Sequence, residues 1–179
     1  IYDGYILDRA LNSSDISLPE PGSGGSLGAD TDILVDGVRP KVLSLTTEDT
    51  RDLLGIGDTL AISVNFSEPV FVEASRLRFA LDTGEEDGIA EYVSGSGGPS
   101  LVFNYIVLEG ASSIDLGYND SASILFDSGF ILDLPGNSAD LGLPGIGESG
   151  SFVSSYSIEI DGIRAEVGGI SSSMPDGQY

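Results

Sequence analysis

The chain of 179 residues contains no cysteine, no histidine and no tryptophan. Without cysteine and histidine it cannot form a disulfide, a thiolate nucleophile, a Ser-His-Asp triad or a Cys/His zinc site. Positive charge is also scarce, because 7 Lys and Arg stand against 29 Asp and Glu and give a formal net charge of −22. That charge repels nucleic acid and anionic lipid, so we expect neither nucleic-acid binding nor membrane insertion. No apolar run reaches the roughly 18 residues of a membrane span.

Two kinds of chemistry survive these exclusions, carboxylate catalysis and the binding of hard cations. A glycosidase needs a pair of carboxylates at a set separation, but nothing in the sequence marks such a pair, so we expect no enzymatic activity. Calcium suits the composition, because its ligands are carboxylates, amide oxygens and backbone carbonyls. The lack of cysteine fits an extracellular bacterial protein that avoids disulfides. Hydrophobic residues make up 40% of the chain, which is enough to build a core.

The sequence contains an internal repeat with a period of 125 residues. Residues 1–42 and 126–167 align without a gap at 17 identical positions, whereas chance gives roughly 3 or 4 in a chain of ordinary composition. The matched motifs are Tyr5-Ile6-Leu7-Asp8 with Phe130-Ile131-Leu132-Asp133, Asn12-Ser13 with Asn137-Ser138, Leu18-Pro19 with Leu143-Pro144, and Asp36-Gly37-Val38-Arg39 with Asp161-Gly162-Ile163-Arg164. A period this long suits whole domains in tandem rather than solenoid units of 20–50 residues.

The repeat predicts the domain organisation. Residues 1–35 correspond to the C-terminal part of one domain, residues 36–160 to one complete unit, and residues 161–179 to the start of a third. Neither flanking fragment contains a counterpart of roughly residues 55–125. We therefore expect the chain to be a window on a longer tandem array. The alternative is a subunit that neighbouring chains complete by donating strands.

Inside the complete unit, apolar and polar residues alternate with a period of two, which is typical of half-buried antiparallel strands. The clearest runs are residues 60–66, 77–81 and 101–107. Further strands are expected at residues 41–46, 91–94, 124–126, 129–132 and 157–160, with a turn of helix at 47–54 and at 111–115. Seven or more short strands separated by glycine-rich turns predict an all-β fold, an immunoglobulin-like antiparallel β-sandwich.

A set of ordered motifs resembles a known type of repeat. The motifs are Asp36-Gly37-Val38-Arg39-Pro40, Gly57-Asp58-Thr59-Leu60, Phe66-Ser67-Glu68-Pro69-Val70, Tyr92-Val93-Ser94-Gly95-Ser96-Gly97 and Ile131-Leu132-Asp133-Leu134-Pro135-Gly136-Asn137. In this order they resemble the bacterial immunoglobulin-like, or cadherin-like, tandem repeats of giant secreted adhesins and cell-surface proteins, RTX-type adhesins among them. One departure is Ala10-Leu11 in the first copy, where the second has Pro135-Gly136.

The resemblance implies a function as well as a fold. It implies a non-enzymatic spacer or stalk at the bacterial cell surface, whose partners are neighbouring repeats or identical subunits, with surface glycan and host or biofilm matrix as further candidates. Two other functions stay open. One is a self-assembling filament, sheath or surface-layer subunit to which neighbouring chains supply strands or packing, and the other is a glycan-binding module.

Calcium is the cofactor that the resemblance implies, bound at domain junctions where it stiffens the linker. The candidate ligands are the acids at the expected junctions, Glu68 after the strand at 60–66, and acids and amides that occur in both copies: Asp36, Glu68, Asp133, Asn137, Asp140 and Asp161. Two alternatives remain. Asp and Asn also recur because they stabilise turns, and an acidic surface can serve solubility in salt.

Overall fold

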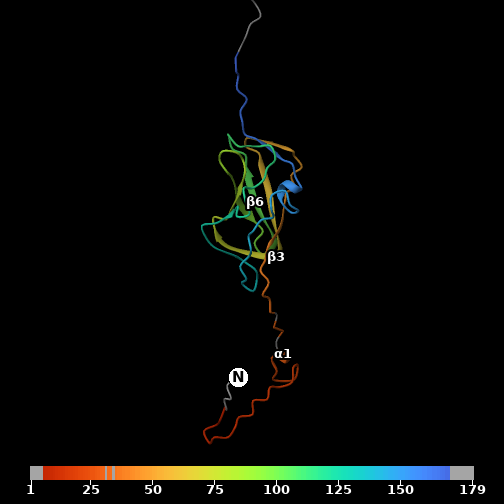
Figure 1. The fold of residues 1–179 in the computed structure, drawn as a ribbon, viewed down its shortest axis with the longest axis vertical. Coiled ribbons are helices and arrows are strands. Elements are labelled where there is room, and N and C mark those ends of the chain that lie inside the picture. Colours follow the sequence, from red (N-terminus) through yellow and green to blue (C-terminus); the bar gives the residue numbers. More distant parts are fainter. Residues whose placement is uncertain (1–5, 31, 34, 170–179) are drawn as a thin grey trace, which may run out of the picture. The chain divides into compact units, whose positions relative to one another are not determined.

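The computed structural model describes residues 6–30, 32–33 and 35–169 of the chain. Contacts divide the chain into two units, Ile1–Asp36 and Gly37–Tyr179. The first unit contains helix α1 (Leu27–Asp30), and the second contains strands β1 to β10 (Figure 1). Among the described residues, no helix has the length and apolar character needed to cross a membrane.

Most of the second unit is one curled, antiparallel, seven-stranded sheet. In spatial order its strands are β1 (Val42–Thr46), β3 (Thr59–Ser75), β6 (Gly98–Ile106), β5 (Gly88–Ser94), β4 (Arg78–Leu81) and β8 (Ile124–Leu125), while β9 (Ser128–Leu132) pairs with β3 off this path. In a second, three-stranded sheet, β10 (Glu159–Asp161) lies between β2 (Leu53–Gly55) and β7 (Ser112–Ser113). The β2–β10 pair is parallel. The prediction of an all-β fold is confirmed.

Strand β3 is the longest strand and pairs with three others. Its first part pairs with β1 and β6, and residues 71–75 pair with β9. Leu60, Ile62 and Val64 are fully buried, whereas Ala61 between them is exposed. Successive side chains of a strand point to opposite faces, so the alternation that predicted this strand is the alternation that builds the core.

A bulge interrupts β3 where its pairing changes. The register with β6 shifts between Asn65 and Val70, and Pro69 in this stretch has no N–H to donate to a sheet. The residue just before β1 is hydrogen-bonded to the bulge. The Ser67 N–H donates to the Lys41 carbonyl at 2.9 Å, and the Lys41 N–H donates to Ser67 Oγ at 3.1 Å. Residue Glu68 is thereby held beside the start of the second unit.

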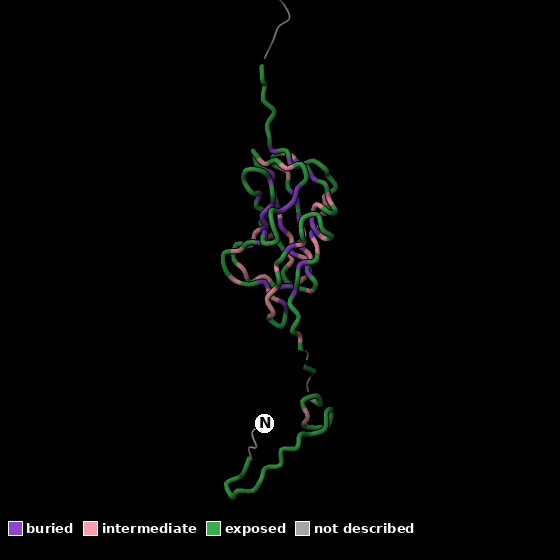
Figure 2. Tube along the Cα trace, in the orientation of Figure 1, coloured by how far each residue is buried: buried purple, intermediate pink, exposed green. Residues whose placement is uncertain are grey.

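The core is completed by the C-terminal third of the second unit. Phe103 of β6 packs edge-on against Phe79 and Tyr92, with ring centroids 6.0 and 5.8 Å apart. Buried segments continue after β8 (Figure 2), and their large hydrophobic residues are Ile131, Leu143, Phe152, Ile158 and Ile160. Phe152 lies in the 3₁₀ turn η1 (Phe152–Ser154). Residues 126–160 are therefore part of the core and do not merely cover it.

The helical turns expected at residues 47–54 and 111–115 are wrong. Residues 53–55 form β2 and residues 112–113 form β7, and both strands pair with β10. Leu54 is fully buried opposite Ile160. Pairing with a distant strand overrides the local pattern here, because β-structure depends strongly on context. The helical segments that do form, α1 and η1, were not predicted.

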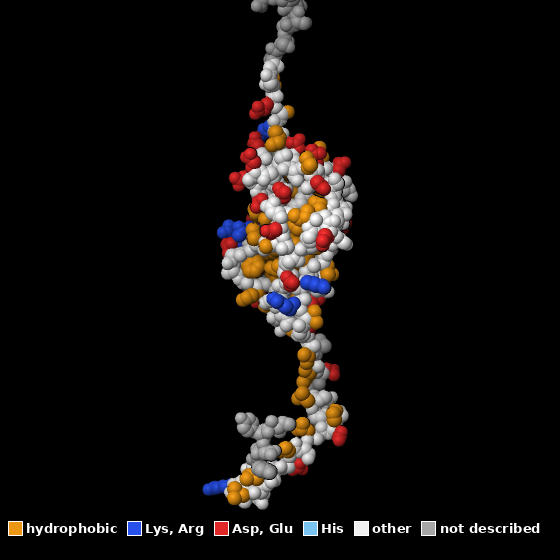
Figure 3. Space-filling model, viewed as in Figure 1, with side chains coloured by type: hydrophobic (Ala, Val, Ile, Leu, Met, Phe, Trp, Pro, Cys, Tyr) orange, Lys and Arg blue, Asp and Glu red, His pale blue; other side chains and the backbone are white. Residues whose placement is uncertain are grey.

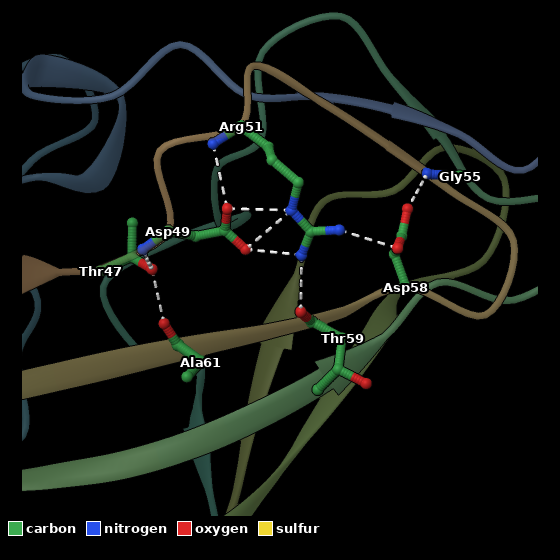
Figure 4. A network of polar contacts seen from close by, with 7 residues as sticks. All are labelled: Thr47, Asp49, Arg51, Gly55, Asp58, Thr59 and Ala61. Carbon is green, nitrogen blue, oxygen red and sulfur yellow. Dashed lines mark hydrogen bonds and ion pairs between the residues drawn. The ribbon is translucent and has the colours of Figure 1, made fainter.

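A polar network around Arg51 fixes the loop between β1 and β3 (Figure 4). The guanidinium lies 2.6 Å from an Asp49 oxygen and 2.7 Å from an Asp58 oxygen, and it also donates to the Thr59 carbonyl at 3.1 Å. The other Asp58 oxygen accepts the Gly55 N–H at 2.8 Å. Hydrogen bonds from Arg51, together with its charge, lower the pKa of Asp49 to about 2.

Replacing Gly95 with alanine tests the hairpin between β5 and β6. Gly95 has a φ of 114°, and a Cβ there would collide with the backbone carbonyl of Ser100. We expect Gly95→Ala to lower the free energy of unfolding by about 2 kcal/mol or more. The matched control is Gly57→Ala, where φ is 87° but a Cβ meets open space, so only the backbone cost of about 1 kcal/mol applies. Equal losses for the two variants in urea unfolding would contradict the steric argument.

The Arg51 network makes a pH-dependent contribution to stability. The pKa of Asp49 falls from an ordinary 3.8 to about 2 on folding, so the unfolded state takes up the proton first as the pH drops. The contribution is therefore complete above pH 3.8 and is lost as the pH falls towards about 2. We expect the stability difference between wild type and Asp49→Asn to shrink across this window in urea unfolding. Glu48→Gln, at an exposed neighbour, should show no such change.

Candidate metal site

Asp133 directly follows strand β9, and its carboxylate organises the turn that comes next. Its Oδ1 accepts the N–H groups of Gly136 at 2.8 Å and Asn137 at 2.6 Å, and its Oδ2 accepts Asn137 Nδ2 at 2.7 Å. The turn favours a glycine at this position, because Gly136 has a φ of 99°, a region that side chains disfavour. These bonds hold the Asp133 side chain, which is only 4% exposed, in one orientation.

Asp133 is negatively charged at neutral pH despite its burial. Burial by itself raises the pKa of this carboxyl. The hydrogen bonds from the Asn137 side chain, the Asn137 N–H and the Gly136 N–H act in the opposite direction, and the net pKa lies below the ordinary value of 3.8. Hydrogen bonds to a carboxylate favour its ionised form. The turn therefore presents a fixed negative charge rather than a neutral acid.

Two further carboxylates lie close to Asp133. Single carboxylate oxygens of Asp36, Glu68 and Asp133 all lie within 4.8 Å of one another. Glu68 comes from the bulge of β3. Asp36 is bonded directly to Gly37, the first residue of the second unit. The sequence positions of these acids are far apart, and the bulge and the turn after β9 bring them together.

Hydrogen bonds hold the start of the second unit against the turn after β9. The Arg39 Nε donates to the Ser138 carbonyl at 2.8 Å. The Asp140 N–H donates to the Pro40 carbonyl at 2.7 Å, and Lys41 forms a parallel bridge with Asp140. Residues 39–41 and 138–140 therefore run side by side.

The cluster has the chemistry of a hard-cation site. Three like charges at this separation repel one another, and a divalent cation between them offsets that repulsion. Calcium binds six to eight oxygens at about 2.3–2.6 Å, so two ligand oxygens on one ion are at most about 5 Å apart. The observed limit of 4.8 Å between the carboxylate oxygens fits this geometry. Three carboxylates would supply part of the shell, and the remaining ligands would be backbone carbonyls or water.

The structure places the six predicted ligands in different settings. Asp36, Glu68 and Asp133 come together, and Asn137 lies beside them through its bond to Asp133. Asp140 instead accepts the Gly142 N–H at 3.1 Å. Asp161 ends β10 and accepts the Ile163 N–H at 3.0 Å, as a turn residue does. Figure 1 shows that residues 162–169 leave the second unit at the end opposite residues 37–40.

Four arginines of the described chain are paired with acids outside the cluster. Arg51 bonds Asp49 and Asp58, Arg76 and Arg78 both bond Asp127, and Arg164 bonds Glu109. Arg164 and Glu109 are both exposed, and such pairs contribute little to stability. On the face drawn in Figure 3, acidic side chains are widely scattered and basic ones are sparse.

Sequence reasoning missed a cavity of about 440 Å³ in the second unit. Its lining includes Tyr105, Ile106, Leu108 and Thr83, together with four acids, Glu85, Glu86, Asp87 and Glu109. Burial raises the pKa of Tyr105, although a hydrogen bond with Thr83 opposes the shift. Thr83 Oγ1 in turn donates to the Glu86 carbonyl at 2.9 Å. The hydroxyl groups of this cavity therefore bond to the protein itself, so the cavity is a weaker candidate for a site than the acidic cluster.

Comparison with protein-family models, curated proteins and solved structures finds no match to this chain. The family resemblance drawn from the motifs therefore stays a prediction. The geometry of the chain itself carries the case for a site at Asp36, Glu68 and Asp133.

Two substitutions separate the structural role of Asp133 from the electrostatic role of its neighbour. Asp133→Ala leaves three donors of the turn without their acceptor, so we expect a lower melting temperature even in excess chelator. Glu68→Gln keeps the side-chain shape and removes one of three mutually repelling charges, so in chelator we expect an unchanged or higher melting temperature. Thermal unfolding followed by circular dichroism checks both. A large loss for Glu68→Gln in chelator would show that the cluster is held together without an ion.

Proposed function

We propose that the chain is a non-enzymatic structural repeat of a long extracellular bacterial adhesin or surface protein, acting as a calcium-stiffened spacer. One observation carries this proposal. The chain enters the second unit through residues 37–40 at one end and leaves it through residues 162–169 at the other (Figure 1). When a domain has its two chain ends at opposite ends of the fold, repeating it lengthens the array along one direction. A domain with adjacent chain ends does not lengthen the array in this way.

The internal repeat supports the same role. Asp36-Gly37 stands where the second unit begins, and Asp161-Gly162 stands in the same motif where it ends. In a tandem array, Asp161 would stand directly before the following repeat, as Asp36 stands directly before this one. That assignment explains why Asp161 lies at the far end of the unit from Glu68 and Asp133. If Asp161 belonged to the same cluster as these two acids, it would lie beside them. The array would then contain one acidic cluster at each junction.

Calcium would stiffen a junction by linking residues on its two sides. Asp36 precedes Gly37, whose backbone is free to rotate because glycine has no Cβ, while Glu68 and Asp133 belong to the folded unit. An ion bound to all three carboxylates would cross-link the chain before the glycine to the body after it. The whole chain carries a formal net charge of −22, which favours solubility and opposes lateral aggregation outside the cell. The proposed partners are neighbouring repeats of the same type.

A calcium melt with matched variants tests the proposal. Ligand binding to the folded state adds RT ln(1 + [L]/Kd), so calcium at 100 times its Kd raises the free energy of unfolding by about 2.7 kcal/mol. We expect millimolar calcium to raise the melting temperature above that in chelator, and magnesium to reproduce little of the rise. Glu68→Gln and Asp36→Asn should lose most of the calcium effect.

Asp161→Asn is the matched control for this experiment. It removes an acid from the same Asp-Gly-x-Arg motif but leaves Asp36, Glu68 and Asp133 intact, so the calcium effect should persist. If wild type shows no calcium effect, or if Asp161→Asn loses it as fully as Asp36→Asn does, the calcium-stiffened spacer is rejected. The recurrent acids would then be assigned to turns and to solubility.

A further inference from the structure

The first unit exposes the apolar side chains that a folded domain would bury. Ile6, Leu18, Leu27, Ile33 and Val35 are between 58% and 88% exposed. Figure 2 shows the described residues before Asp36 as exposed along almost their whole length, and Figure 3 shows apolar side chains on their surface. A segment that functions alone in water has no reason to carry large apolar residues at so many positions.

Each of these residues has a buried counterpart 125 positions later. The counterparts are Ile131, Leu143, Phe152, Ile158 and Ile160, and none of them is more than 6% exposed. Three of the five pairs are identical, and the other two exchange Leu for Phe and Val for Ile. The same apolar pattern is therefore buried in the second copy and exposed in the first.

The local backbone of the two copies also matches. In the first copy the Asp8 N–H donates to the Asn12 carbonyl at 2.9 Å and Asn12 Nδ2 donates to Asp8 Oδ2 at 2.9 Å. In the second, the Asp133 N–H donates to the Asn137 carbonyl at 3.1 Å and Asn137 Nδ2 donates to Asp133 Oδ2 at 2.7 Å. Leu11 occupies the position of Gly136 and has, unusually for leucine, a φ of 65°. The turn forms in both copies although only one packs against a core.

A second turn recurs at the same spacing. The Gly22 N–H donates to Ser26 Oγ at 3.0 Å, and the Gly147 N–H donates to Ser151 Oγ at 3.1 Å. The φ angles of Gly22 and Gly147 are 84° and 80°. Residues 27–30 and 152–154 then form short helical segments. At these two turns the first copy therefore already has the local conformation that the second copy adopts in a completed domain.

We propose that residues 6–35 are a domain-completing segment, which docks on the sheet of a second copy of this repeat as residues 131–160 dock on residues 42–125. The inference rests on the repeat organisation of the proposed function and names the partner of the first unit. Within the chain, residues 128–132 already pair with the second half of β3, and β10 already lies between β2 and β7. Both positions in its own sheet are therefore filled, so residues 6–35 need the sheet of a second copy whose own closing segment is absent or displaced.

The docked arrangement makes specific contacts. Leu132 pairs with Phe71 of β3, and Ile131 pairs with Val72, so Leu7 and Ile6 would take these places opposite Phe71 and Val72 of the acceptor. Val35 would take the place of Ile160, between β2 and β7. Near the C-terminal end of the chain the relation is reversed: there the residue of the first copy is buried and its counterpart in the second copy is exposed. Val42 of β1 is 8% exposed, whereas its counterpart Val167 is 84% exposed.

The test uses the full chain with its own closing segment disabled. Phe152→Asp with Ile160→Asp places two charges in the core, so residues 131–160 should leave the sheet. In chelator, we expect this double variant to regain β-structure only on assembling head to tail, with a mass that rises with concentration in analytical ultracentrifugation. Adding Leu27→Asp and Val35→Asp, the equivalent changes in the first copy, should abolish assembly. Wild type should stay monomeric.

A cross-link identifies the contact itself, because the chain has no cysteine to compete. In the double variant, Leu7→Cys with Phe71→Cys should give disulfide-linked multimers under mild oxidation, whereas Leu11→Cys with Phe71→Cys should not. Assembly that survives Leu27→Asp and Val35→Asp, equal cross-linking from positions 7 and 11, or a double variant that stays monomeric at every concentration would overturn the inference. Because chelator is present throughout, failure here is independent of failure of the calcium effect.

Discussion

The structure depends on the pairing of one strand, β3. Its 17 residues pair with β1 and β6 in the first part and with β9 in the second. Since side chains alternate across a strand, a slip of one residue would turn the whole buried set of Leu60, Ile62 and Val64 to the solvent. The burial of those residues therefore fixes the register of β1 and β6, and through them the position of the β5–β4–β8 edge.

The bulge in β3 follows from this constraint and places the acidic cluster. A strand that changes partners cannot keep one regular ladder, and the irregularity falls between Asn65 and Val70. Bulges redirect side chains and often lie next to functional sites. Here the bulge contains Glu68, and the two chain segments that converge on it carry Asp36 and Asp133. The site is thus located where the regular sheet ends, at the end of the second unit that the chain enters.

Sequence periodicity predicted the strands that are buried on one face. It did not predict the short strands that form by pairing with a segment distant in sequence. The runs at 60–66, 77–81 and 101–107 were predicted because alternation records which face is buried. Strands β2 and β7 are two or three residues long and exist through β10, so nothing local marks them. The Arg51 network joins residues close in sequence, and the Asp49-x-Arg51 spacing could have suggested it. Asp36 and Asp133 were named because they recur in both copies of the repeat, and Glu68 through the family resemblance, because no spacing rule connects residues so far apart. The immunoglobulin-like sandwich and the tandem period stay predictions.

The order of pairing has a consequence for the synthesis of the protein. Leu54 pairs with Ile160, 106 positions later, and residues 71–75 of β3 pair with β9, which is synthesised after them. Contacts of such long sequence separation form slowly, because loop closure costs entropy before any contact is gained. A nascent chain that ends before residue 126 would expose an incomplete sheet to its neighbours on the same polysome. In a tandem array, domains that share a closing pattern must therefore finish one after another, each before the next presents an open sheet. Rapid N-to-C completion is thus a requirement that this architecture places on its own biosynthesis.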